Sequence, residues 1–468
     1  MSSSQPADSH AEKDAAKRDD YEVLHRDPSY FQYYSQLQHQ QNMLQDHVRT
    51  SAYHSAITFN GPSLFRDRLV MDVGAGSGIL SFFAAQAGAK HIYAVEASGM
   101  ARKMQLMLDS AKPGAGSRVR NAYLADRITI VSAKIEEPSL LSQVPQVDAI
   151  ISEPIGVLLV HERMLESFVY ARDKFLRPGG AMLPSSGTIH LAPLSDAALW
   201  NETITKARFW QQEAFYGVDI NPYFAPSLDE YFSSPVVGCF SPTTLMSDSA
   251  VHPVDFHTVT MSELKEFVVR IEWHVGYTGV MHGVAGWFDL AFVPPVSALH
   301  PGTAPSAVYM STGPQAPATH WQQVRMLFKQ PLAVNSGQVV RGLVHMKVND
   351  QRSYDINAKL IVLDAEESLR VSDDALLRMF DSNRARAREA LWYLHEQIYN
   401  YSYTGEPLEP VRPEAANLYL PVDALLAESA SRRGEAPVNV QGVPGSLTDF
   451  VITTAAKADA QMETSDRI

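Results

Sequence analysis

The architecture of this chain is predicted from one stretch, Leu69-Val70-Met71-Asp72-Val73-Gly74-Ala75-Gly76-Ser77-Gly78-Ile79. Its first five residues have the character of a buried β-strand, and residues 79–87 continue as an apolar helix. A glycine turn between a strand and a helix lets the backbone, with its free N–H groups, approach a ligand closely. The third glycine, Gly78, comes one position too early for a G-x-G-x-x-G dinucleotide fingerprint, which disfavours a pyrophosphate cradle.

Three further apolar runs continue the alternation of strand and helix: His91 to Val95, Arg127 to Val131 and Val147 to Ile151. We therefore expect a Rossmann-like α/β domain within residues 28–184, broken toward its end by Pro178-Gly179-Gly180. The second strand ends in Glu96, a carboxylate placed to accept both hydroxyls of a ribose. Together with Asp72 and the glycine turn, Glu96 predicts a site for an adenosyl ligand.

Two glutamates, Glu153 and Glu162, bracket an apolar run after the fourth strand. Pro154 ends that strand, because it cannot donate to a sheet. Carboxylates beside such sequence are costly to bury unless a cation or a proton arrives. If both face one pocket, they suit a guanidinium, which is planar, permanently charged and carries five N–H donors. By themselves, the residues leave open the plainer alternative, in which both side chains point into water from a loop.

The chain changes character after residue 184, where short β-type runs are separated by Pro, Gly and Ser. This pattern predicts an antiparallel β domain, a barrel or a sandwich, over residues 185–406. The runs are Thr188 to Leu191, Glu266 to Trp273, Gly286 to Phe292 and Gln338 to Lys347. An aromatic-rich, partly helical insert at about residues 200–231 is expected to pack on its own domain or to contact a second subunit. A late helix is expected over Ala385 to Tyr399.

The two ends of the chain are expected to be disordered, since residues 1–27 and 407–468 are poor in large apolar side chains. The segment from Tyr30 to Arg49 is predicted to run as a helix. One face of it carries three aromatic side chains, Tyr30, Phe31 and Tyr34. That face serves either as core packing or as an aromatic lid over a ligand.

Composition narrows the expected partners. The net charge of −13 argues against nucleic acid or an anionic membrane as the main partner, and it favours encounter with basic segments. The single cysteine, Cys239, excludes an intrachain disulfide and a cysteine-based metal site. The sequence contains neither a run of about 18 apolar residues nor an apolar signal core near its start. A reducing compartment, cytosol or nucleus, is therefore expected.

Four separated motifs, taken together, resemble the protein arginine N-methyltransferases, and the resemblance runs from about Tyr30 to Tyr403. The motifs are Val70 to Leu80, Val95-Glu96, the loop from Glu153 to Glu162, and Thr319-His320-Trp321. Further matches, at Gln40-Gln41-Asn42-Met43 and Val48-Arg49-Thr50, make the type I coactivator-associated, histone-arginine branch the most similar. The resemblance implies a Rossmann-like class I methyltransferase domain followed by an antiparallel β-barrel domain with a helical dimerisation arm.

The resemblance implies S-adenosylmethionine as methyl donor, S-adenosylhomocysteine as product, and no metal. Cofactor-binding residues carried over from it are Tyr30, Phe31, Tyr34, Gln40, Arg49, Asp72, Gly74, Gly76, Gly78, Glu96, Ile135, Glu136 and Ser167. Catalytic residues carried over are Glu153, Glu162, His320 and Asp46. Residues expected on the substrate side are Met43, Met164 and Trp321. Arg49 would pair the cofactor carboxylate, and Asp46 would orient His320.

The function that the resemblance implies is methylation of arginine guanidinium nitrogens in proteins, giving mono- and asymmetric dimethylarginine. Expected substrates are histones and RNA-binding or transcription-related proteins, with a role in chromatin regulation in the nucleus and cytoplasm. A head-to-tail homodimer through the arm is expected, without direct nucleic-acid or membrane binding. Two alternatives stay open: a weakly active scaffold or coactivator that uses the fold for protein binding, and a small-molecule methyltransferase, which the paired glutamates disfavour.

The resemblance is imperfect between the two glutamates. Ile155 and Val157 stand where the family usually has Met and Tyr, and His161 replaces a usual aromatic residue or Asn. We expect these three positions to give the chain an unusual substrate preference. An insert near Lys112 to Tyr123 lengthens a surface connection.

Overall fold

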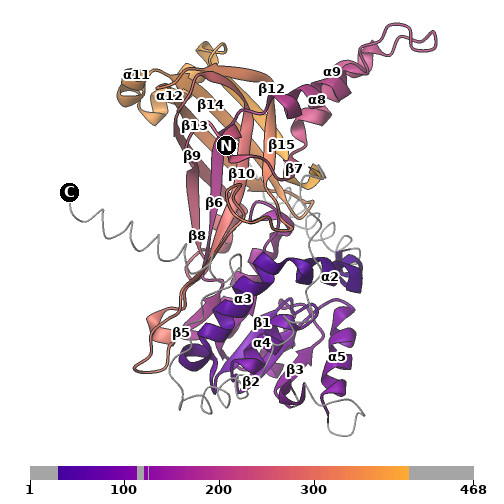
Figure 1. The fold of residues 1–468 in the computed structure, drawn as a ribbon, viewed down its shortest axis with the longest axis vertical. Coiled ribbons are helices and arrows are strands. Elements are labelled where there is room, and N and C mark those ends of the chain that lie inside the picture. The colour runs from indigo at the N-terminus through magenta and orange to yellow at the C-terminus, as the bar shows by residue number, and fades with distance from the viewer. Residues whose placement is uncertain (1–29, 113–120, 125, 400–468) are drawn as a thin grey trace, which may run out of the picture.

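The computed structural model describes residues 30–112, 121–124 and 126–399. The predicted tails lie outside these residues, as does most of the predicted insert near Lys112 to Tyr123. Two domains are stacked along the long axis of the molecule (Figure 1). The first, in indigo to purple, is built on a parallel sheet, and the second, in magenta to orange, is built from antiparallel strands.

The first domain contains a five-stranded sheet in which every strand runs parallel to its neighbours. In spatial order the strands are β3 (Ile128–Val131), β2 (His91–Val95), β1 (Leu69–Val73), β4 (Val147–Ser152) and β5 (Leu176–Leu183). The four apolar runs predicted as strands are therefore confirmed. The strand order reverses between β1 and β4, and in such sheets ligands bind beyond the carboxyl ends of the strands at that point.

The labelled helices in the described part of this domain are α2 (Leu37–Gln45), α3 (His47–Phe59), α4 (Ile79–Gln86), α5 (Met100–Ser110), α6 (Leu140–Gln143) and α7 (Met164–Phe175). The segment predicted as one helix from Tyr30 to Arg49 is divided into a first helix at residues 30–34, then α2, then α3. Asp46 causes the second break, because its side chain accepts the backbone N–H of Arg49 and caps α3. No helix in the described part of the chain is long and apolar enough to cross a membrane.

Pro178-Gly179-Gly180 does not break the strand pattern, contrary to the sequence prediction, but lies inside β5. β5 is the edge strand of the sheet, and its register with β4 shifts across this segment. An edge strand tolerates proline and glycine at such a bulge because its open side needs no ladder hydrogen bonds.

The second domain consists of two sheets whose strands run antiparallel, apart from the short parallel pair β16 and β7. One sheet contains β16 (Ile398–Tyr399), β7 (Val236–Val237), β12 (Val324–Val334), β10 (Gly279–Phe292), β6 (Ser186–Leu194) and β8 (Ala250–Asp255), with β11 (Val308–Ser311) beside β10. The other contains β15 (Ala387–Tyr393), β14 (Tyr354–Leu363), β13 (Val339–Val348) and β9 (Glu266–His274). Because β8 contacts β9 and β12 contacts β15, the sheets close into a barrel.

A helical arm projects from the barrel at the upper right of Figure 1. It consists of α8 (Ala197–Arg208) and α9 (Phe224–Ser233), in the region where the sequence predicts a helical insert. Asp196 fixes its base, because one carboxylate oxygen caps α8 at Leu199 and the other lies 3.1 Å from the Arg325 guanidinium of β12.

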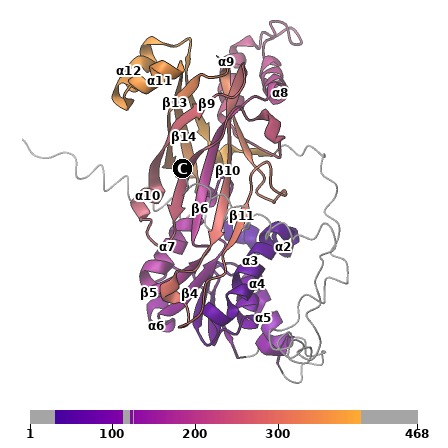
Figure 2. The ribbon, with the colours of Figure 1, turned by 60° about the vertical axis from the view of Figure 1, so that its left-hand side comes forward.

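The late helix predicted over Ala385 to Tyr399 is wrong. These residues hold β15, a 3₁₀ turn at Leu394–Glu396 and β16. Trp392 is fully buried in the barrel, where its indole N–H donates to the carbonyl oxygen of Leu327. Three shorter helices that the sequence did not predict are α10 (Met261–Lys265), α11 (Ala365–Arg370) and α12 (Asp373–Ser382). Figure 2 shows α11 and α12 at the end of the barrel remote from the first domain.

Several connections of the barrel reach the first domain. In the connection from β10 to β11, His300 donates its backbone N–H to the carbonyl oxygen of Ser63, and Ser306 exchanges two hydrogen bonds with the Asn60 side chain. The turn from β13 to β14, residues 349–353, contacts the loop that carries Glu162. The candidate site lies at this junction of the two domains.

Candidate active site at the domain junction

The glycine turn between β1 and α4 has left-handed backbone geometry, with φ of +68° at Gly74, +53° at Gly76 and +84° at Gly78. A side chain at Gly76 would meet Gln40, whose Oε1 lies 2.8 Å from the Cβ position. The same oxygen accepts the backbone N–H of Ser77 at 3.0 Å. Both the positive φ and this close contact favour glycine here, and the backbone of the turn borders the site.

Two acids stand at the ends of β1 and β2. Glu96 is 6% exposed, and its two oxygens accept the backbone N–H groups of Gly76 at 2.7 Å and Ser98 at 2.6 Å. Asp72 accepts the Ser81 hydroxyl at 2.7 Å, and burial raises its pKa to about 7. The side chain of Glu96 is thus tied to the glycine turn, which fixes a carboxylate where a ribose is expected.

Three further predicted cofactor residues come from two segments. Ile135 is buried beyond β3, and the adjacent Glu136 accepts the hydroxyl of Ser167, from α7, at 2.6 Å. The structure therefore brings together Glu136 and Ser167, which lie far apart in the sequence. With the glycine turn and Glu96, these residues supply polar groups that suit the ribose and adenine of an adenosyl ligand.

Glu153 follows β4 and lies against Arg49 of α3. Nη2 of Arg49 is 3.5 Å from Oε2 of Glu153, and the two side chains are 6% and 13% exposed. Within the described residues, Oε1 of Glu153 and Nε of Arg49 are buried without a hydrogen-bond partner. Burial raises the pKa of Glu153, although the Arg49 charge opposes the rise. One oxygen of this carboxylate is therefore left to accept a hydrogen bond from a further donor.

Glu162 receives the hydroxyl groups of two tyrosines from the first helix. The Tyr30 hydroxyl lies 3.0 Å from Oε2, and the Tyr34 hydroxyl lies 2.8 Å from both carboxylate oxygens. Burial raises the pKa of Glu162 against the lowering effect of these hydroxyls. Tyr30 and Tyr34, predicted as cofactor contacts, therefore hold the second glutamate in this structure.

The backbone of the loop between the two glutamates is strained. Four non-glycine residues at its far end have positive φ: Leu158 (+54°), Leu159 (+72°), Glu162 (+71°) and Arg163 (+57°). At Gly156, a side chain would collide with the carbonyl oxygen of His161. Such angles are seldom adopted by residues with side chains and gather where function fixes the backbone.

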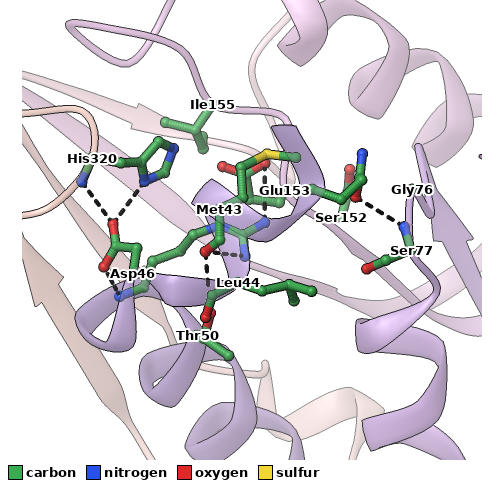
Figure 3. A network of polar contacts seen from close by, with 12 residues as sticks. Met43, Leu44, Asp46, Thr50, Gly76, Ser77, Ser152, Glu153, Ile155 and His320 are labelled. Carbon is green, nitrogen blue, oxygen red and sulfur yellow. Dashed lines mark hydrogen bonds and ion pairs between the residues drawn. The ribbon is translucent and has the colours of Figure 1, made fainter. Parts of the chain in front are cut away.

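Asp46 and His320 form the predicted pair (Figure 3). Oδ2 of Asp46 lies 2.7 Å from Nδ1 of His320 and accepts its backbone N–H at 2.8 Å. The histidine side chain is 30% exposed and the aspartate 3%. Burial works to raise the pKa of Asp46, but hydrogen bonds from His320 and Arg49 lower it overall.

Met43 and Met164 border the space between the glycine turn and the glutamates. Figure 3 shows Met43 beside Glu153. The terminal methyl carbon of Met164 lies 3.6 Å from the position that a Cβ would take at Gly74. The two methionines predicted on the substrate side therefore approach the site from different segments of the first domain.

The three loop positions predicted to set substrate preference are anchored to the protein. Ile155 and Val157 are 7% and 6% exposed. The carbonyl oxygen of Ile155 accepts the indole N–H of Trp321 at 3.1 Å. His161 Nδ1 lies 2.8 Å from the Ser353 hydroxyl, and burial lowers the pKa of this histidine to about 4. Trp321, predicted on the substrate side, is 4% exposed, and its hydrogen bond to Ile155 supports the loop.

Sequence reasoning missed Arg352, which lies in the barrel turn after β13. Its guanidinium carbon is 4.4 Å from the centroid of the Tyr30 ring, and Nη2 is 3.5 Å from the carbonyl oxygen of Glu162. The one sequence signal is the polar run Asn349-Asp350-Gln351, which marks a turn but does not indicate what the turn touches.

Two family models match the chain. That of the arginine methyltransferase oligomerization subdomain covers residues 185–362, which hold most of the barrel and the arm. That of the ribosomal protein L11 methyltransferase (PrmA) covers residues 63–106, which hold the glycine turn and Glu96. The two matches fall on the two domains separately.

The matches to curated relatives are long enough to include both domains. The probable histone-arginine methyltransferase CARM1 of Oryza sativa subsp. indica is 46% identical over 327 residues, 70% of this chain and 58% of the relative. The probable histone-arginine methyltransferase 1.4 of Arabidopsis thaliana is 45% identical, and the histone-arginine methyltransferase CARMER of Drosophila ananassae 43% identical, each over 71% of this chain and 58% of the relative. The chain thus spans 58% of the length of these relatives.

Solved structures share the two-domain arrangement. Protein arginine methyltransferase 10 of Arabidopsis thaliana, in a uniquely open conformation, has a TM-score of 0.63 and 27% identity over 78% of this chain and 99% of its own. The Trypanosoma brucei PRMT1 enzyme–prozyme heterotetrameric complex with AdoHcy has a TM-score of 0.60 and 26% identity over 77% and 99%. The site geometry, the relatives and these neighbours agree, and in each comparison the chain is similar to protein arginine methyltransferases.

Proposed function

We propose that this chain methylates guanidinium nitrogens of arginine residues in proteins, with S-adenosylmethionine as methyl donor. The observation that carries the proposal is the pair Glu153 and Glu162, two carboxylates with raised pKa values at the ends of one strained loop. The pair lies beside a cradle that fits an adenosyl ligand. The names of the relatives, histone-arginine methyltransferases, support the same activity.

A guanidinium complements this pair in charge and in donor geometry. Its five N–H groups form a planar fork that two carboxylates can engage from two sides, whereas an ammonium is a compact point charge. Glu153 and Glu162 each lose hydration through burial, so a bound cation offsets that cost for both. The glutamates draw positive charge away from the attacking nitrogen and fix its direction, and positioning of this kind supplies much of the rate.

The glycine turn and its neighbours would hold S-adenosylmethionine, which supplies an electrophilic methyl group when bound. Glu96 would accept the ribose hydroxyls, and adenine would meet Ile135, Glu136 and Ser167. Arg49 would pair the cofactor carboxylate and so release Glu153 for the guanidinium. The Trypanosoma brucei complex is described with AdoHcy, which supports this assignment of the cofactor.

His320 would take the proton that leaves the methylated nitrogen. Asp46 lies 2.7 Å from Nδ1 of the ring and favours the tautomer that has its proton there, so Nε2 carries the lone pair. Methylation makes the nitrogen proton easy to remove, so a weak base such as imidazole is sufficient.

We further propose that the final product is asymmetric dimethylarginine. Met43 and Met164 border the acceptor position, and their unbranched, adaptable side chains leave space for a second methyl group on the same nitrogen.

The proposed substrates are basic protein segments, histones foremost, and RNA-binding or transcription-related proteins. The chain's net charge of −13 favours encounter with such segments. A head-to-tail homodimer is proposed through the arm, where Phe209 is 48% and Tyr216 93% exposed and where the matching family model describes an oligomerization subdomain. Because the proposed histone substrates are nuclear, we propose the nucleus as the main location of the protein and the cytoplasm as its second.

Transfer of labelled methyl groups to matched histone-tail peptides, with Arg or Lys at the same position, tests the activity. We expect label in the arginine peptide alone, and tandem mass spectrometry should place both methyl groups on one terminal nitrogen. Label in the lysine peptide, or in neither, would contradict the proposed activity. Monomethyl or symmetric product alone would contradict the proposed product type.

A further inference from the structure

One turn of the barrel holds the loop that carries the second glutamate. This turn, residues 349–353, connects β13 to β14. Arg163 Nη1 donates to the carbonyl oxygen of Asn349 at 3.1 Å, and Nδ1 of His161 lies 2.8 Å from the Ser353 hydroxyl. The residues on both sides of Glu162 are therefore fixed from the second domain.

Arg352 of this turn contacts three parts of the site. Its guanidinium carbon lies 4.4 Å from the centre of the Tyr30 ring, within the range of a cation–π contact. Its Nη2 lies 3.5 Å from the carbonyl oxygen of Glu162 and 4.0 Å from the sulfur of Met164. One barrel side chain thus contacts the first helix at residues 30–34 (the aromatic helix), the loop from Glu153 to Glu162, and Met164, which is predicted on the substrate side.

The backbone of Arg352 is held in a conformation that residues with side chains seldom adopt, with φ of +55°. The turn around it is rigid, because the side-chain oxygen of Asn349 accepts the backbone N–H groups of Gln351 at 3.0 Å and Ser353 at 3.1 Å. The turn therefore aims the Arg352 side chain at the first domain at the expense of backbone strain.

Other cations hold the aromatic helix from within the first domain. Nζ of Lys134 lies 5.4 Å from the centre of the Phe31 ring, and Lys103 donates to the carbonyl oxygen of Ser35 at 2.5 Å. Arg352 differs from both lysines because it reaches the helix from the barrel. Its contact with Tyr30 links the position of the barrel to the residue that bonds Glu162.

We propose that Arg352 is a positioning residue that couples the barrel to the aromatic helix and keeps the Glu162 carboxylate charged and aimed at the substrate. The inference rests on the proposed function and adds a residue to it. Arg352 acts through its contacts with the Tyr30 ring and with the carbonyl oxygen of Glu162, which bring its positive charge close to the second glutamate.

Charged and titratable groups face Glu162 from three elements: Tyr30 and Tyr34 from the first helix, Glu153 from the end of β4, and Arg352 from the barrel turn. Burial is the main cause of the raised pKa of Glu162, and Glu153 adds to it. The tyrosine hydroxyls and the Arg352 charge oppose the rise. Without Arg352, the pKa of Glu162 rises further, so the Glu162 carboxylate becomes protonated, and loses its charge, at a higher pH as the pH falls.

The pH dependence of kcat/KM for an arginine peptide tests the electrostatic part. In Arg352→Gln we expect the acidic limb to move up by about one pH unit, which is a loss of about tenfold on that limb. Arg352→Lys keeps the charge and should keep the limb in place. Arg386→Gln, which removes a barrel arginine paired with Glu367, is the matched control and should follow the wild type. An unmoved limb in Arg352→Gln would overturn the proposal.

Amide hydrogen exchange of residues 30–34 tests the coupling without any turnover. In the cofactor-free protein, Arg352→Gln should raise exchange of these amides by about fivefold, because one cation–π contact is lost. Arg386→Gln should leave it unchanged. Equal protection in all three proteins would overturn the coupling. If the wild type methylates neither peptide, the proposed function fails, while this exchange measurement still decides the coupling.

Discussion

The cofactor half and the guanidinium half of the site are built in opposite ways. The cofactor half uses residues of the first domain, chiefly the glycine turn, Glu96, Glu136 and Ser167, and Glu96 bonds the glycine turn directly. The guanidinium half is assembled from the first helix, α3, the loop after β4 and two barrel segments. The first forms wherever the parallel sheet forms, because its contacts are made at one sheet edge. The second exists only when the two domains meet.

This difference indicates which changes should affect which step. A change in the cofactor half should alter cofactor binding or the stability of the first domain and leave the peptide contacts in place. A change in the guanidinium half should alter turnover or peptide affinity and leave cofactor affinity in place. The following variants test this separation.

Glu153→Gln should have the largest effect. The amide keeps the shape of the carboxylate but removes the charge that the guanidinium needs, so turnover should fall about a hundredfold. Cofactor affinity, measured by calorimetry, should stay close to that of the wild type. A variant that keeps more than about a tenth of wild-type turnover would remove Glu153 from the clamp.

Asp72 should make the stability of the first domain depend on pH. Its pKa is raised by burial from 3.8 to about 7, so between these values the unfolded chain releases a proton that the folded protein keeps. Stability should therefore fall as pH rises through this window. Relative to Asp72→Asn, we expect the wild type to lose about 2 kcal/mol between about pH 5 and 6.5, measured by urea unfolding. Parallel curves for the two proteins would contradict the burial of a protonated Asp72.

Gly76→Ala tests the backbone wall of the cofactor half. The added Cβ would lie 2.8 Å from Gln40 Oε1, so the Gln40 side chain must move, and a φ of +53° strains the backbone of any residue that carries a side chain. We expect cofactor affinity to fall about tenfold, with the affinity for an arginine peptide measured separately and unchanged. Gly217→Ala, in the arm and with open space around its Cβ position, is the control for a left-handed glycine. Unaltered cofactor binding in Gly76→Ala would place the ligand elsewhere.

Trp321→Phe should have the smallest effect. It removes the indole N–H that reaches the carbonyl oxygen of Ile155 at 3.1 Å but keeps an aromatic ring in the core. The loop loses one hydrogen bond, so KM for the peptide should rise about fivefold while cofactor affinity holds. An equal loss in both affinities would show that the two halves are not separable.

The parts of the site that sequence predicted are those in which neighbouring residues determine the outcome. The glycine turn follows from three glycines between an apolar strand and an apolar helix, and Glu96 follows from its place at a strand end. The Asp46 to His320 pair was predicted only through the resemblance, because 274 residues separate the two. No local pattern reports such a contact.

What the sequence did not predict also has a physical cause: it concerns residues whose role depends on contacts with distant parts of the chain. Residues 385–399 carry Trp392, Tyr393 and Ile398, which were expected at the apolar positions of a helix, yet Trp392 packs inside the barrel and β15 pairs with β14. Arg352 escaped notice because a polar turn residue gains its role only when the barrel meets the first domain. The expectation that Ile155, Val157 and His161 give an unusual substrate preference stays a prediction, and the structure shows Ile155 and Val157 buried in the loop.

Peptide affinity for arginine against citrulline tests the account most directly, because citrulline has nearly the same shape as arginine but no charge. Calorimetry on the cofactor-loaded protein should find the arginine peptide bound about a hundredfold more tightly, since charge-assisted pairs with two glutamates are lost in citrulline. In Glu153→Gln the preference should shrink to about tenfold or less. Equal affinity for the two peptides in the wild type would contradict a carboxylate clamp at Glu153 and Glu162.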